Sequence, residues 1–248
     1  MRRFAARPPM KPFYHLGTVT RINIFVHWTT VVMFFGLFLY YLWRGVSLGA
    51  ALAGVLLIAV VFGCVLLHEL GHALAARHFG IGTRDITMYP IGGVARLERI
   101  PRVPAHEFWI AVAGPAVNLG LAAGFFVFNL LTGRPLSIDA LLPPRTTIPG
   151  MLMWVNLLLA GFNLLPAFPM DGGRVLRAWL AARLPYHRAT RIAAWIGQAM
   201  AILFGLAGLL DFNPVLVFIG LFVFLGARQE VRAVAETERT GYGYPGPA

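Results

Sequence analysis

The amino-acid sequence predicts an all-α polytopic membrane protein, with about six transmembrane helices and a small β-hairpin or sheet between the second helix and the third. Hydrophobic residues make up 58% of the 248 residues, and charged residues make up 12%. A soluble domain carries about twice that charged fraction. The net charge of +11 would suggest nucleic acid in a soluble protein. Here the arginines flank apolar runs, so we expect a lipid bilayer and no nucleic acid as partner.

The first half of the chain is expected to hold a basic arm, two spans and a β-hairpin. Residues 1–23 form the arm, which is rich in arginine and contains several prolines. Between the second span and the third, β-branched residues alternate with others on both sides of Gly92 and Gly93. This alternation around a glycine pair predicts a hairpin at residues 83–100.

The second half is expected to hold four spans and a tail. The fourth span breaks at Pro166 and Pro169, and an amphipathic helix follows at residues 174–184. Residues 228–248 are charged and end in Gly and Pro, which predicts a disordered tail. The membrane core is therefore placed at residues 24–227. Its spans are expected at about residues 24–43, 50–79, 108–131, 150–166, 192–210 and 212–227.

The distribution of basic residues predicts the orientation of the chain. If six spans alternate from a cytoplasmic N-terminus, all but three of the 21 lysines and arginines lie on the cytoplasmic side. The exceptions are Arg44, Arg134 and Arg145. Because positive charge gathers in cytoplasmic loops, we expect a multi-pass protein of a prokaryotic cell membrane with both termini in the cytoplasm. The last apolar run, residues 214–227, is short for a full crossing.

Residues 65–77, with the sequence VLLHELGHALAAR, carry the strongest signal for chemistry. Residues four apart share a face of a helix, so His68 and His72 can bind one zinc ion while Glu69 holds a water molecule. The alternative is a chance match with hydrogen-bonded core histidines. Two histidines and a glutamate at ligand spacing on an apolar helix favour the metal site. Since Cys64 is the one cysteine, an internal disulfide and a Cys-rich zinc site are excluded.

Asp171 is the candidate for a third zinc ligand. It lies in the stretch NLLPAFPMDGGR, where prolines and glycines interrupt the fourth apolar run. Non-helical backbone at membrane depth occurs where it is buried in protein or lines a wet cavity. A carboxylate at such a break can complete a site of three protein ligands and one water. The alternative is that Asp171 caps the helix that follows.

These motifs together resemble the site-2 protease family of intramembrane zinc metalloproteases. The resemblance rests on HELGH at residues 68–72 and on N-x-x-P-x-x-P-x-D-G at residues 163–172. Gly-Pro-x-x-Asn at residues 114–118 and Ile-Gly-Gly at residues 91–93 also match the family pattern. The similarity covers roughly residues 24–184.

The resemblance implies a six-helix membrane core that cleaves a transmembrane helix of a partner protein. Many members also carry a PDZ domain between the motifs or CBS domains after the core. The loops of this chain are short, so we expect a minimal member without either; its oligomeric state stays open. The roles implied by resemblance are one zinc ion bound by His68, His72 and Asp171, a general base at Glu69, and substrate or oxyanion binding at Asn118 and Asn163.

Two other functions remain open. The same ligands could serve a non-catalytic membrane metal-binding or transport protein, but such a protein does not need a carboxylate at Glu69. A membrane zinc protease that cuts soluble chains would need a sizeable extramembrane domain, and the sequence indicates none. Asn118 and Asn163 have their own alternative, as hydrogen-bonding residues between helices.

A strand edge is the candidate for holding an unwound substrate. Unwinding exposes backbone groups that are costly to leave unpaired in the membrane. The segment Gly92, Gly93 and Val94 is apolar and lies between the two motif-bearing spans, so it could pair with a substrate strand. We expect a proline at Val94 to block cleavage by removing a backbone donor. The alternative is an ordinary surface hairpin.

Overall fold

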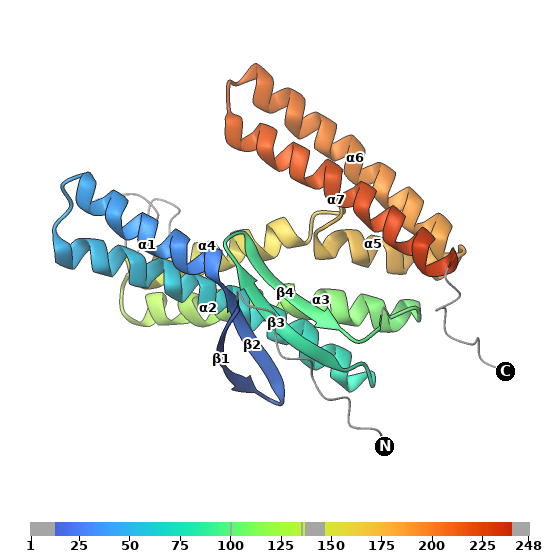
Figure 1. The fold of residues 1–248 in the computed structure, drawn as a ribbon, viewed down its shortest axis with the longest axis horizontal. Coiled ribbons are helices and arrows are strands. Elements are labelled where there is room, and N and C mark those ends of the chain that lie inside the picture. Colours follow the sequence, from blue (N-terminus) through green and yellow to red (C-terminus); the bar gives the residue numbers. More distant parts are fainter. Residues whose placement is uncertain (1–12, 100, 135, 137–146, 240–248) are drawn as a thin grey trace. The chain divides into compact units, whose positions relative to one another are not determined.

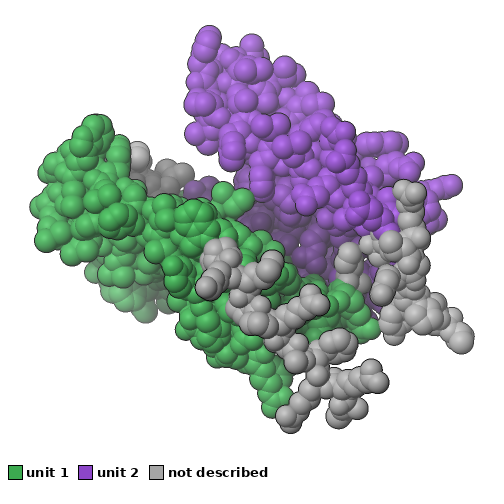
Figure 2. Space-filling view, viewed as in Figure 1, with its two compact units in different colours: residues 1–99, 123–155 green, residues 100–122, 156–248 purple. Residues whose placement is uncertain are grey.

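The computed structural model describes residues 13–99, 101–134, 136 and 147–239. The chain divides into two compact units, which Figure 2 colours separately. Unit 1 comprises residues 1–99 and 123–155, and unit 2 comprises residues 100–122 and 156–248. The boundaries fall within two helices, α3 (Pro104–Leu131) and α4 (Ile148–Asn163), so each of these helices contributes to both units.

Unit 1 combines two helices with a four-stranded sheet (Figure 1). The strand order is β1-β2-β3-β4, in which β2 and β3 are parallel and the outer pairs are antiparallel. Helices α1 and α2 lie between β2 and β3 in the sequence, which provides the crossover that a parallel pair requires. The bounds are β1 Phe13–Val19, β2 Ile22–His27, α1 Trp28–Trp43, α2 Leu48–His78, β3 Thr83–Tyr89 and β4 Gly92–Leu97.

The predicted hairpin is confirmed, but the sheet is twice as large as the sequence suggested. Strands β3 and β4 match the expected hairpin, whereas β1 lies in the predicted basic arm and β2 takes the start of the predicted first span. Ile24 to His27 was expected to be helical and is strand. The reason is the short alternating run Ile22–His27, whose Ile22 and Ile24 are each 4% exposed while the strand pairs on both sides. Residues 1–12 of the arm lie outside the described residues.

The sheet packs on the half of α2 that carries the histidine motif. Leu70 and Ala73 of α2 form one buried cluster with Ile22, Ile86 and Met88 of the sheet. Alternate residues of β3 face this cluster, as the period of a strand requires. The core of unit 1 therefore fixes the position of the histidine motif relative to strands β3 and β4.

Unit 2 contains α5 (Asp171–Ala181) and an antiparallel pair, α6 (Tyr186–Leu210) and α7 (Pro214–Arg239), which Figure 1 shows side by side. A Cβ atom at Gly220 would lie 2.7 Å from the carbonyl oxygen of Ala201, so the glycine permits the close approach of the two helices. The Asn213 side chain accepts hydrogen bonds of 3.1 and 3.2 Å from two backbone N–H groups in the first turn of α7.

The expected disordered tail is wrong over residues 228–239, because α7 continues without a break to Arg239. The segment is charged and the chain ends in Gly and Pro, but an apolar stripe persists on one face of the helix. Ala227 is buried in a cluster with Phe168 and Ala193, and Val231 packs against the same cluster. Packing of this stripe stabilises the helix beyond the apolar run. Residues 240–248 lie outside the described part of the chain.

The polytopic helical fold is confirmed, while the count of six spans stays a prediction. Among the described residues, four helices are long and apolar enough to cross a membrane. Helices α1 and α4 are apolar but have 16 residues each. At about 1.5 Å per residue they are roughly 24 Å long, less than the hydrocarbon core of about 30 Å. The four candidate spans are Leu48–His78, Pro104–Leu131, Tyr186–Leu210 and Pro214–Glu236.

Candidate metal centre

Helix α2 places His68 and His72 on one face, as their spacing predicted. Both residues are 5% exposed, and their Nε2 atoms are 3.1 Å apart. Two imidazoles on one tetrahedral zinc ion, each at about 2.0–2.1 Å, would hold their nitrogens roughly 3.3 Å apart. The observed separation is close to that value, so the two side chains fit one zinc ion.

Glu69 lies against strand β4 within unit 1. Its Oε2 accepts a hydrogen bond of 3.3 Å from the backbone N–H of Ala95. A Cβ atom at Gly93 would lie 2.5 Å from Cγ of Glu69, so glycine is what lets the strand approach the carboxylate. The candidate base and the candidate substrate strand are therefore in direct contact.

The same hydrogen bond identifies which backbone groups of β4 face away from β3. The Ala95 N–H points to Glu69 on α2, and successive residues of a strand direct their backbone groups to opposite sides. Gly93 thus shares the outer side with Ala95, whereas Val94, paired with Thr87, faces β3. Glu98, four residues further along on the same inner side, donates its N–H to Gly82 O at 2.9 Å. A proline at Val94 would therefore remove a donor of the β3 ladder, and its effect on cleavage stays a prediction.

Asp171 begins α5 in unit 2, at the chain break that the sequence marked. It is 7% exposed, and its carboxylate is 3.6 Å from the Arg174 guanidinium. The N-cap of α5 is Met170, which makes no side-chain cap bond, so Asp171 is not the capping residue. Cβ atoms at Gly172 and Gly173 would overlap the backbone of residues 164–168, so the glycine pair lets α5 start against the break. His68 and His72 belong to unit 1, and the joining of Asp171 to them stays a prediction.

The two candidate asparagines make helix hydrogen bonds. In unit 2, Asn118 Nδ2 donates to Asn156 Oδ1 at 2.8 Å, and both residues are fully buried. Asn163 Nδ2 donates to Leu159 O of its own helix at 2.9 Å. Asn118 therefore has the alternative role, a hydrogen bond between two helices. The catalytic role of either asparagine stays a prediction. Asn156 was not among the predicted site residues, although a lone amide inside the apolar run WVNLLL is a signal for one.

A buried ionic cluster in unit 2 was also missed. Arg177 of α5 is 2% exposed and donates through Nε to Glu107 Oε1 of α3 at 2.8 Å, with a second bond from Nη2 to the same oxygen. Its Nη1 donates to Glu230 of α7 at 2.5 Å. Burial lowers the pKa of Arg177, but the carboxylates of Glu107 and Glu230 outweigh burial and raise it overall, so the guanidinium stays charged.

Aromatic rings complete this cluster. The Arg177 guanidinium lies 5.0 Å from the ring centroid of Phe168 and 4.9 Å from that of Tyr186. Phe168 belongs to the broken segment that leads to Asp171. Arg177 therefore ties this segment to α3, α6 and α7. From the sequence, Arg177 was expected only to be one of the cytoplasmic charges.

The helical membrane fold and the paired histidines together define the class of protein. It is an integral membrane protein that carries a metalloprotease motif. Residues 56–142 and 144–204 match the profile of Peptidase family M50. The chain belongs to this family, and the predicted resemblance is confirmed. A solved structure described as a site-2 protease from Methanocaldococcus jannaschii matches with a TM-score of 0.63 and 35% identity, over 89% of this chain and 95% of that one.

Curated relatives agree with this assignment. A zinc metalloprotease of Methanocaldococcus jannaschii is 42% identical over 72% of this chain and 50% of its own length. A Mycobacterium tuberculosis protein, named as a candidate zinc metalloprotease, is 34% identical over 89% of this chain and 59% of its own length. The chain thus spans about half the length of the curated relatives it matches.

Proposed function

We propose that the protein is an intramembrane zinc metalloprotease that hydrolyses a peptide bond in or near the transmembrane helix of a membrane-bound protein. The observation that carries this proposal is the pair of convergent imidazoles with Glu69 between them on an apolar helix. Family membership and the names of the relatives support it. The two termini face the cytoplasm of a prokaryotic cell in this proposal, because basic residues gather on that side.

One zinc ion per chain is bound by His68, His72 and Asp171. Imidazole nitrogens and a carboxylate oxygen are ligands that zinc prefers, and three of them leave one position for water. All three side chains are at least nine-tenths buried. When bound, the ion lowers the pKa of its water toward about 7 and polarises the scissile carbonyl.

Glu69 acts as the general base and then as the proton donor. Its carboxylate takes a proton from the attacking water and passes it to the nitrogen of the leaving amine. The hydrogen bond from Ala95 N–H restricts the orientation of the carboxylate. The Asn118 and Asn163 amides assist by donating to the substrate carbonyl or its oxyanion, once each amide turns from its present acceptor.

The outer edge of β4 binds the substrate as an added strand. In the order β1-β2-β3-β4, this strand has a neighbour on one side only among the described residues. Its segment Gly92, Gly93 and Val94 passes Glu69, so a paired substrate backbone would run beside the base. Val94 is 49% exposed and Ile91 80% exposed, which leaves apolar side chains to contact an apolar substrate.

The test is co-expression with a library of single-span membrane proteins, comparing the wild type with Glu69→Gln. Fragments that appear with the wild type and disappear with the variant support the proposal. If no library member is cleaved while both proteins bind zinc, the chain is a metal-binding or transport protein and the proposal fails.

A further inference from the structure

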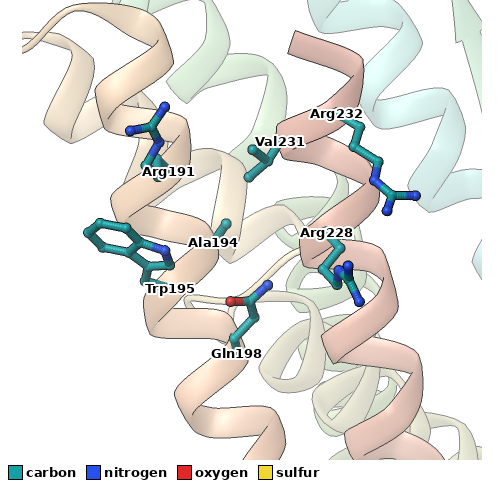
Figure 3. Close-up of a pocket in the computed structure, with 7 residues that line it drawn as sticks. All are labelled: Arg191, Ala194, Trp195, Gln198, Arg228, Val231 and Arg232. Atoms are coloured by element: carbon teal, nitrogen blue, oxygen red, sulfur yellow. The ribbon is translucent and has the colours of Figure 1, made fainter. Parts of the chain in front are cut away.

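A groove lies between the first half of α6 and the last half of α7, within unit 2. It encloses about 240 Å³. Both walls carry arginine, with Arg191 on α6 and with Arg228 and Arg232 one turn apart on α7. Figure 3 shows the residues that line it: Arg191, Ala194, Trp195, Gln198, Arg228, Val231 and Arg232.

The three arginines of this groove differ from those arginines of the chain that are buried or form ion pairs. Arg177 lies between two glutamates, and Arg96 forms a bidentate pair with Asp85. Among the residues that the structure describes, Arg191, Arg228 and Arg232 are exposed and form no ion pair. Three positive charges thus line one groove, and none of them forms an ion pair with a described residue.

The depth of the groove in the membrane makes an anionic ligand favourable. From Pro214, where α7 begins, to Arg228 the helix rises about 21 Å, whereas the hydrocarbon core is about 30 Å thick. If the α6–α7 turn lies at one surface, Arg228 lies about 9 Å inside the opposite edge of the hydrocarbon. A charge at that depth is costly unless it pairs with an anion or reaches the headgroups. Trp195, 61% exposed, is typical of a side chain at this boundary.

We propose that this groove binds the phosphate headgroup of an anionic phospholipid. Guanidinium groups bind phosphate oxygens through paired N–H donors, and Trp195 and Gln198 offer further N–H donors for the glycerol esters. The acyl chains would lie along the exposed apolar side chains of α6, where Leu203 is 65% and Leu206 is 53% exposed. Three unpaired positive charges favour a lipid with a net negative charge over a zwitterionic one. This site is separate from the proposed protease chemistry.

The experiment is native mass spectrometry of the full chain released from nanodiscs that contain equal parts of phosphatidylglycerol and phosphatidylcholine. The wild type should retain phosphatidylglycerol in preference to phosphatidylcholine. The double substitution Arg228→Gln and Arg232→Gln should reduce this retention by about tenfold or more, because the loss of even one charge-assisted pair lowers binding by about a factor of ten. The matched control, Arg84→Gln with Arg188→Gln, removes the same charge from exposed positions outside the groove and should keep wild-type retention.

Two results would overturn the proposal. The first is equal loss of phosphatidylglycerol in the groove variant and in the control, which would indicate a general charge effect. The second is thermal protection of the detergent-solubilised wild type by inorganic phosphate to the same extent as by phosphatidylglycerol, which would indicate a site for a soluble anion. Unchanged zinc content of both double variants confirms that they are folded, so that a loss of lipid is read as a loss of binding.

Discussion

Replacing Arg177 with methionine should destabilise unit 2 strongly, because it leaves a carboxylate buried without its counter-charge. Glu107 is 0% exposed, and after the substitution its nearest remaining donor is the Tyr186 hydroxyl at 3.4 Å. Breaking a buried pair by removing one partner costs about 3–5 kcal/mol. For a chain of this size, that loss lowers the unfolding midpoint by roughly 6–20 °C.

A double-mutant cycle separates this effect from simple loss of volume. Adding Glu107→Gln to Arg177→Met removes the uncompensated charge, so the double variant should recover a large part of the lost stability. Thermal unfolding in detergent measures each variant against Arg188→Met, an exposed control on α6. A midpoint for Arg177→Met within about 2 °C of the control, or a double variant less stable than the single, would refute the reasoning.

Three further predictions concern the metal, the strand edge and the topology. Purified Asp171→Ala and His72→Ala should each lose most of the zinc measured by metal analysis, and full occupancy in both would contradict the ligand set. A photocrosslinking residue at Val94, in a Glu69→Gln background, should capture a cleavable substrate, whereas the same residue at Arg84 should not; equal capture would argue against the edge. Reporter fusions at residues 1 and 248 should both report the cytoplasm, and an external C-terminus would mean that α7 does not cross.

Features that depend on local sequence were predicted well. The histidine motif lies on a helix because an unbroken apolar run surrounds it, and β3 and β4 follow from alternation around Gly92 and Gly93. The break before Asp171 follows from the prolines and glycines around it. Each of these signals lies within a window of about a dozen residues.

Features that depend on tertiary contacts were missed. The run Ile22–His27 is too short to distinguish a strand from the start of a helix, and its pairing with β3 decides the matter. The partners of Arg177 lie 70 and 53 residues away in the sequence, so no local pattern joins them. The extension of α7 to Arg239 depends on packing against Phe168, which the sequence does not reveal.

The central claim, that Glu69 acts as the base beside a zinc ion, is tested by one paired measurement. Zinc content and cleavage rate are determined on the same preparations of wild type and Glu69→Gln, with a substrate found by co-expression. The amide keeps the shape of the side chain but cannot accept the proton from water. We expect zinc content equal to that of the wild type and a rate lower by at least about 10² to 10⁴. Full zinc content together with near-wild-type cleavage would contradict the account.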